Sequence, residues 1–117
     1  MIVEIKAIYL SDFSDFYTFV PDDPEHFAVE LRAMVGPVGE EWSESFRFTA
    51  CSPGWIKEQI EIEGFMWRCD LLIVNDYNRL EIKRIADKAI SRCMAPSWQE
   101  VAAQISRRTN WEFDTYT

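Results

Sequence analysis

The 117-residue sequence has one histidine, three cysteines and four glycines, and it has no long apolar run. Its uninterrupted apolar stretches are short, such as residues 71–74, whereas a membrane-spanning helix needs about 20 apolar residues. The first ten residues, MIVEIKAIYL, carry Glu4 and Lys6 inside the apolar pattern and lack a cleavage site of small residues. They therefore predict a strand and not a secretion signal. We expect a single domain over residues 1–117 that is cytoplasmic and does not contact a membrane.

The scarcity of histidine, cysteine and glycine excludes several kinds of site. A zinc site needs three or four ligands, and His26 is the only histidine. Cys51, Cys69 and Cys93 are odd in number and widely spaced, which indicates reduced thiols. Glycine-rich phosphate loops and the Gly-x-Ser-x-Gly motif of hydrolases are absent. We therefore expect no metal site and no catalytic residue among these residues.

Basic residues are few, 12 against 20 acidic ones, and the net charge is −8. This balance argues against nucleic acid as a direct partner, because phosphates require clustered Lys and Arg. The charge is also uneven, with ten acids against two bases in residues 1–45. Such asymmetry indicates a negative face that could steer a basic protein partner, or acids that only maintain solubility. The basic helix expected at residues 79–92 interleaves its charges with Glu81 and Asp87, as a solvated outer face does.

Two segments combine acids with aromatic rings. Residues 11–26, SDFSDFYTFVPDDPEH, hold five acids and four aromatic residues without any Lys or Arg. Some of these rings should anchor the loop, while an exposed Tyr or Trp among acids is also typical of a binding hot spot. Trp42 lies in a second acidic stretch at a predicted hairpin tip. The candidate partner-binding residues are Asp12, Asp15, Tyr17, Asp22, Asp23, Glu25, Glu40, Glu41, Trp42 and Glu44.

Apolar alternation predicts the N-terminal half of the fold. Residues 1–10 form a strand whose inward side is Val3, Ile5, Ala7 and Tyr9. Residues 26–35 and 42–51 also alternate, with Arg32 and Arg47 on the outward side. The glycine-containing turn between them, residues 36–40, makes the pair an antiparallel hairpin.

In the second half of the sequence, the spacing of apolar residues changes mostly from that of strands to that of helices. Ser52 and Pro53 start a short helix that Gly64 ends. Residues 65–74 predict a strand, and the apolar LLIV at its end indicates a central position buried on both faces. Residues 78–93 form an amphipathic helix, and SWQE at 97–100 is a capping box that opens another. Residues 110–116 are either a final strand or a packed tail. The fold class is therefore α+β, an antiparallel sheet of four to five strands with two to three helices packed on one face.

An ordered set of motifs resembles the immunity protein 8 family of bacterial polymorphic toxin and contact-dependent inhibition systems. The motifs span nearly the whole chain and are FVPDDPEHFAVEL, GPVGEEWSESF, CSPGWI, EGFMWR…LLIVNDY and SWQEVAAQISRRTNWEFDTY. The family pattern has glycines where this chain has Arg68 and Asn110. The resemblance implies an α+β protein without enzymatic activity or cofactor, which binds the C-terminal domain of a cognate toxin and neutralises it. Trp98 and Trp111 fit fold anchors better than contact residues.

Charge adds a hypothesis about the toxin. A nuclease has a basic substrate groove, which an acidic surface can cover, so we expect the toxin to be a nuclease. The immunity protein is expected to be a monomer or weak homodimer. Two alternatives stay open: a small hydrolase or metal-dependent enzyme using clustered carboxylates, and a non-catalytic adaptor subunit. The hydrolase would show paired carboxylates with raised pKa values in a pocket, and the adaptor a large apolar patch.

Overall fold

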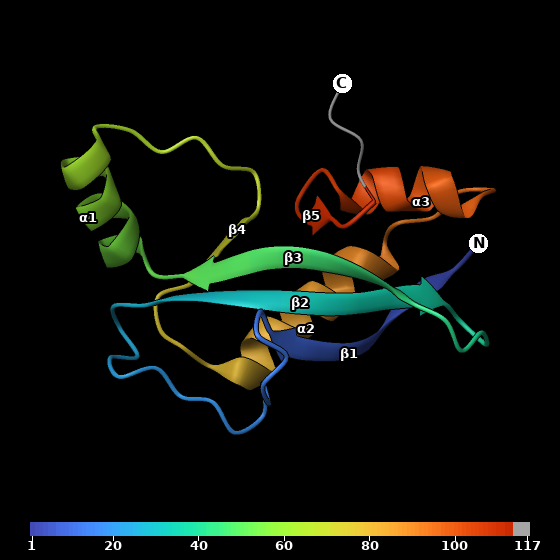
Figure 1. Cartoon of the computed structure of the whole chain (residues 1–117), viewed down its shortest axis with the longest axis horizontal. Helices are drawn as coiled ribbons and strands as arrows, with labels where there is room; N and C mark the ends of the chain where they lie inside the picture. The colour runs from blue at the N-terminus through green and yellow to red at the C-terminus, as the bar shows by residue number, and fades with distance from the viewer. Residues whose placement is uncertain (114–117) are drawn as a thin grey trace.

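The computed structural model describes residues 1–113, and its element order runs from a strand hairpin to a helical second half (Figure 1). The elements are β1 (Val3–Leu10), β2 (Ala28–Pro37), β3 (Glu44–Cys51), α1 (Pro53–Glu63), β4 (Leu71–Ile73), α2 (Arg79–Ser91), α3 (Trp98–Ile105) and β5 (Asn110–Trp111). In the described part of the chain, no helix is long and apolar enough to cross a membrane.

One sheet organises the molecule. Its strand order is β1-β2-β3-β4, and β5 pairs with β3 as well. The pairs β1–β2, β2–β3 and β3–β5 are antiparallel, and β4 runs parallel to β3 because α1 and a long loop carry the chain back between them. The α+β prediction is confirmed, with a sheet that is mixed but mostly antiparallel.

The core lies between the sheet and the second-half helices. Leu31, Ala33 and Val35 of β2 are fully buried, and Phe46 of β3 is buried beside them. From the other side, α2 contributes Ile82, Ala86 and Ile90, and α3 contributes Val101, Ala102 and Ile105. Helix α1 buries no residue at all. In Figure 1, α2 lies behind the strands, and no helix covers the face of β1–β3 turned toward the viewer.

The predicted inward side of β1 is wrong beyond Ile5. The register with β2 shifts between Ile5 and Ala7, so a bulge reverses the alternation. As a result Ile8 is buried at 3% exposure, whereas Tyr9 is 37% exposed on the opposite face. The sequence pattern could not reveal this bulge, because either parity of the strand contains enough apolar residues to look buried.

The predicted long central strand at residues 65–74 is also wrong. Only Leu71–Ile73 is a strand, and it lies at the sheet edge beyond β3. Ile73 is 53% exposed, so the apolar run is not covered on both faces. Parallel pairing to β3 leaves residues 65–70 as a loop, with Trp67 91% exposed.

The helix boundaries agree with the capping signals. Ser52 accepts from the Trp55 backbone N–H, and Gly64 ends α1 in the left-handed conformation at φ 89°. Ser97 and Glu100 form the expected capping box on α3. At the C-terminal end, β5 confirms a short final strand, and residues 114–116 of the predicted segment lie outside the described residues.

Candidate functional site

The acidic loop between β1 and β2 is tied to the fold by some of its aromatic residues. Phe16 is fully buried, and Phe19 packs edge-on against Tyr77 at a centroid distance of 6.0 Å. Tyr17 is 48% exposed, and Phe13 is 59% exposed. The prediction that part of this set anchors the loop is confirmed by Phe16 and Phe19, and Phe13 and Tyr17 are the members that the loop exposes to solvent together with the acids.

The carboxylates of this loop order its backbone. Asp12 accepts from the backbone N–H of Ser14, and Asp15 and Asp23 each accept in the same way from the residue two positions later. The Ser14 hydroxyl, followed by the Ser14 N–H, lowers the pKa of Asp12. These turns fix where the negative charges stand, and Asp22 and Glu25 are exposed beside them.

The second acidic cluster lies at the β2–β3 hairpin and is partly structural. Glu40 and Glu41 are exposed, whereas Trp42 packs edge-on against Trp98 at 4.9 Å. One oxygen of Glu44 accepts two indole N–H groups, from Trp98 at 2.7 Å and Trp111 at 2.8 Å. This carboxylate therefore joins the hairpin to α3 and β5, which supports the expectation that both tryptophans anchor the fold.

The structure does not bring the two acidic clusters together. The part of the loop that holds Asp22, Asp23 and Glu25 leads into the first residue of β2, and the hairpin follows its last residue, so these acids lie at opposite ends of the strand (Figure 1). Asp12 and Asp15 lie closer to the middle of the sheet, because Leu10 at the end of β1 pairs with Leu31, and Asp15 bridges Tyr9. The ten residues of β2 span roughly 33 Å at about 3.3 Å per residue. A partner that contacts both clusters must lie along most of the molecule, whose extents are 42 × 35 × 23 Å.

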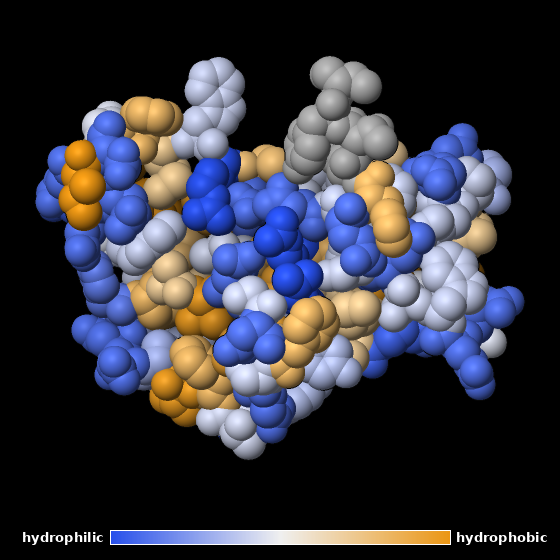
Figure 2. All heavy atoms as spheres, in the orientation of Figure 1, coloured by the Kyte–Doolittle hydropathy of each residue, from blue (hydrophilic) through white to orange (hydrophobic). Residues whose placement is uncertain are grey.

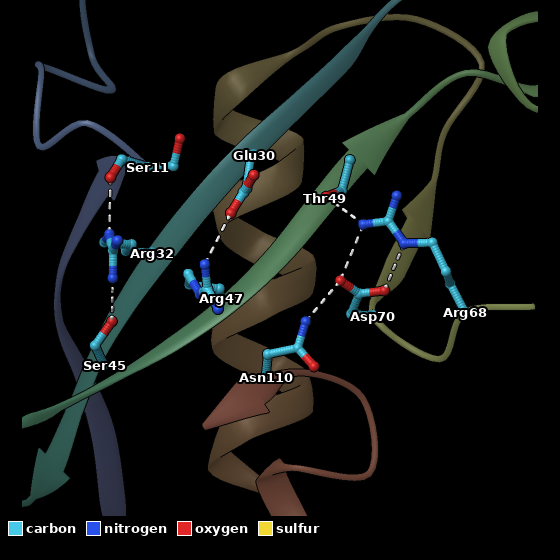
Figure 3. A network of polar contacts seen from close by, with 9 residues as sticks. All are labelled: Ser11, Glu30, Arg32, Ser45, Arg47, Thr49, Arg68, Asp70 and Asn110. Carbon is cyan, nitrogen blue, oxygen red and sulfur yellow. Dashed lines mark hydrogen bonds and ion pairs between the residues drawn. The ribbon is translucent and has the colours of Figure 1, made fainter. Parts of the chain in front are cut away.

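Between the clusters, the uncovered face of the sheet carries polar side chains that sequence reasoning left unused (Figure 3). Arg32 donates through Nε to the Ser11 carbonyl oxygen at 2.9 Å, and its guanidinium lies 4.7 Å from the Phe13 ring centroid. Arg47 pairs with Glu30 at 3.5 Å. The alternation had placed both arginines outward, but only the strand register shows that they face each other directly.

Asp70 is the centre of a second network on the same face. Arg68 donates to both of its carboxylate oxygens at 3.0 Å and also to Thr49, while Asn110 donates to Asp70 at 2.9 Å (Figure 3). Partial burial acts to raise the pKa of Asp70, but the hydrogen bonds and charge of Arg68, together with Asn110, lower it.

The pKa shifts of the carboxyl groups differ from those expected of an enzyme that uses clustered carboxylates. The carboxyl groups with a displaced pKa are Asp12, Asp70 and Glu81, and hydrogen bonds lower all three, whereas a general acid needs a raised value. Among residues 1–113, no group of three His, Cys, Asp or Glu side chains could hold a metal ion.

A groove of about 350 Å³ between β4, α2 and α3 is likewise unsuited to acid catalysis. Its lining is mainly apolar, with Arg92, Arg107 and Arg108 as its charged residues and no carboxylate. Burial raises the pKa of Cys93 in its wall, so that thiol is protonated at neutral pH. On α2 itself, Lys83 pairs with Asp87 and Arg84 with Glu81, as expected for a solvated helix face.

The fold and its surface therefore define a small α+β protein with prominent polar and aromatic surfaces. Comparison with protein families matches the model described as Immunity protein 8 over residues 3–116, and the chain belongs to that family. Membership suggests that it is an immunity protein and implies a toxin protein as its partner. No curated protein and no solved structure matches the chain.

Proposed function

We propose that this chain neutralises a cognate toxin domain by binding it, and that it does so in the cytoplasm of the cell that produces both proteins. The observation that carries this proposal is the family match, which covers residues 3–116 and leaves no space for a separate catalytic domain within the chain. The partner is the C-terminal domain of the toxin. The immunity protein acts as a monomer or weak homodimer, without cofactor or catalysis.

The acidic clusters at the two ends of the sheet are proposed to contact basic residues of the toxin. In the loop these are Asp12, Asp15, Asp22, Asp23 and Glu25, with Tyr17 beside them, and at the hairpin Glu40, Glu41, Trp42 and Glu44. The turns that hold Asp12, Asp15 and Asp23 support this role, because fixed charges lose little entropy on binding. A nuclease is the favoured toxin class, since its groove must attract phosphates and is therefore basic.

Electrostatic attraction between such surfaces accelerates association. Complementary charge raises on-rates toward about 10⁸ M⁻¹s⁻¹ at low salt, and the effect weakens as salt screens the charges. Binding across the mouth of a basic groove then excludes nucleic acid, so inhibition requires no chemistry from the immunity protein. The carboxylate-enzyme alternative would instead need an acid with a raised pKa, and none of the displaced values supports it.

The first test is binding and protection with the toxin domain encoded immediately upstream of this chain. Calorimetry at 50 and 300 mM salt should show tight binding that weakens at the higher concentration, and expression of this chain should rescue cells that produce the toxin domain. Absence of both binding and rescue would refute the immunity role.

The acidic-surface proposal is tested with two variants of equal charge change. The first combines Asp15→Asn, Asp22→Asn, Asp23→Asn and Glu25→Gln, which keep side-chain acceptors for the turns. The matched control combines Glu61→Gln, Glu63→Gln and Asp76→Asn, at exposed positions on α1 and before α2, with Asp87→Asn at a partly exposed position on α2. The loop variant should bind at least about tenfold more weakly and lose part of its salt dependence, since the hairpin acids remain. Equal behaviour of the two variants would move the contact away from the loop.

A further inference from the structure

The uncovered sheet face is cationic at its centre, although the chain as a whole is strongly acidic. Strongly hydrophilic side chains gather over the middle of this face in Figure 2. Three arginines, Arg32, Arg47 and Arg68, lie there with two carboxylates, Glu30 and Asp70. Because Asp22, Asp23 and Glu25 precede β2, and Glu40 and Glu41 follow it, the charge along β2 runs negative, positive, negative.

Two of these arginines are held in an unfavourable arrangement. Arg32 and Arg47 are direct partners in the β2–β3 register, and like charges opposite each other destabilise a sheet. Arg32 donates to the uncharged Ser11 carbonyl and Ser45 hydroxyl and lies over the Phe13 ring, so these contacts hold its guanidinium but supply no negative charge. Arg47 has Glu30 at the long distance of 3.5 Å, in a pair whose side chains are both about half exposed. Such an exposed ion pair contributes little to the stability of the fold. A carboxylate from outside the chain, bound between the two guanidinium groups, would relieve the repulsion.

Beside the arginines stands the most exposed aromatic residue of the described chain. Trp67 is 91% exposed and Phe65 is 67% exposed, both in the loop between α1 and β4. Trp67 lines a shallow depression together with Arg68, Cys69, Asp70 and Asn110, which places it next to the Asp70 network. A tryptophan buries 150–250 Å² when it is covered, so its exposure is costly in a free protein. Trp and Arg are also the residues most enriched in binding hot spots.

We propose that this face, from Arg32 and Arg47 across to Trp67, is the central contact of the toxin domain. The toxin presents a carboxylate to the Arg32–Arg47 pair and an apolar pocket to Trp67, while its basic residues meet the acidic ends. The inference rests on the proposed function and adds to it a central contact whose positive charge is opposite to that of the acidic clusters. The alternating charge then sets the orientation of the toxin, because a shifted or reversed complex would place like charges together.

Other occupants of the face are disfavoured by the same charges. A second copy of the chain would present the same three arginines to this face, since a two-fold interface uses the same patch on both subunits. Nucleic acid could stack on Trp67. However, Glu30 and Asp70 within the face and the acids at its ends would repel its phosphates. A protein surface that carries an acidic residue within basic surroundings is complementary to the cationic centre of the face and to the acidic residues at both of its ends.

The test is calorimetry of the toxin domain encoded immediately upstream against the full-length protein and four variants. Trp67→Ala should weaken binding by about 30-fold or more, as expected for a hot spot. Arg47→Thr should weaken it by about tenfold while leaving the melting temperature unchanged or higher, because the repulsion with Arg32 is removed. The controls are Leu80→Ala and Arg84→Ala on α2, which are exposed but on the helical side of the sheet. Both controls should bind like the wild type.

The outcomes separate this inference from the proposed function. Wild-type binding with unchanged affinity in Trp67→Ala and Arg47→Thr would overturn the inference and leave the immunity role standing. Loss of affinity in Arg47→Thr together with a lowered melting temperature would also count against it, since that result indicates a structural role. A wild-type protein that neither binds the toxin domain nor protects cells from it would refute both this inference and the proposed function. A short single-stranded oligonucleotide that bound the wild type but not Trp67→Ala would assign the face to nucleic acid instead.

Discussion

Asp70 is the residue at which three separate segments of the chain are joined. Its side chain is 10% exposed and accepts from Arg68 and Asn110, and Arg68 also reaches Thr49 on β3. The network therefore holds the loop before β4, the edge of β3 and β5 in one place. Since Arg68 and Asn110 lower the pKa of Asp70 below its usual value, ionised Asp70 stabilises the folded state.

This linkage predicts a pH-dependent effect of Asp70→Asn. The contribution of ionised Asp70 is complete above its unfolded pKa of about 3.9 and is lost as the pH falls through the lower folded value. At pH 7 the variant should be less stable by about 1–3 kcal/mol, because charged hydrogen bonds are lost. The difference should shrink below about pH 4. Urea unfolding at pH 7, 4 and 3 measures it, with Asp76→Asn as an exposed control, and a difference that stays constant with pH would contradict the prediction.

At the scale of elements, the β2–β3 hairpin depends on a close backbone approach at Gly36. A Cβ added there would lie 2.1 Å from the Trp42 carbonyl oxygen, whereas one added at Gly39 meets no atom within 4 Å. Gly39 instead has a left-handed backbone at φ 87°. The two glycines therefore serve the same hairpin for different reasons, one steric and one conformational.

Gly36→Ala should consequently destabilise the protein by about 1–3 kcal/mol or more, since backbone atoms must move to admit the methyl group. Gly39→Asn is the control, because Asn tolerates the left-handed region and open space surrounds the position. It should change the stability by less than about 1 kcal/mol. Thermal unfolding compares the two, and an equal loss in both would mean that the hairpin relaxes freely around Gly36.

The elements also show how far the sequence predicts this fold. Capping residues and turn glycines act locally, so both ends of α1 followed from Ser52 and Gly64, and the start of α3 followed from Ser97 and Glu100. The bulge in β1 and the edge position of β4 did not, because both depend on which strand pairs with which. The LLIV run looked central since apolar runs are typical of strands covered on both faces, but here the run forms a short edge strand beside a groove.

At the scale of the whole molecule, the acidic residues were identified but their separation was not. Alternation and composition cannot show that one strand, β2, divides them into two clusters. Nor can they show that Arg32 and Arg47 stand opposite each other between those clusters, since the register depends on the hairpin geometry. Long-range arrangement, and not residue type, is what the sequence alone left undetermined for the candidate site.

That separation leads to a prediction about additivity. The strand β2, roughly 33 Å long, separates Asp22, Asp23 and Glu25 from the hairpin acids. This length is far beyond the Debye length of about 8 Å at physiological salt, so the two groups should contribute independently to toxin binding. The loop variant described above and a hairpin variant, Glu40→Gln with Glu41→Gln, should each weaken binding. Their combination should equal the sum of the two free-energy changes within about 0.5 kcal/mol. No effect of the hairpin variant would show that the toxin covers only the loop end.

The pairing of β3 has a consequence for the synthesis of the protein. One edge of β3 is shared, with β4 against Thr49–Cys51 and β5 against Phe46 and Arg47. Both partners are made later than the hairpin, and β5 is among the last described residues. As the chain grows at about 5–20 residues per second, that edge stays open for seconds and can pair with another nascent chain. The completed sheet, and with it the Asp70 network, forms only when residues 110–111 have emerged from the ribosome.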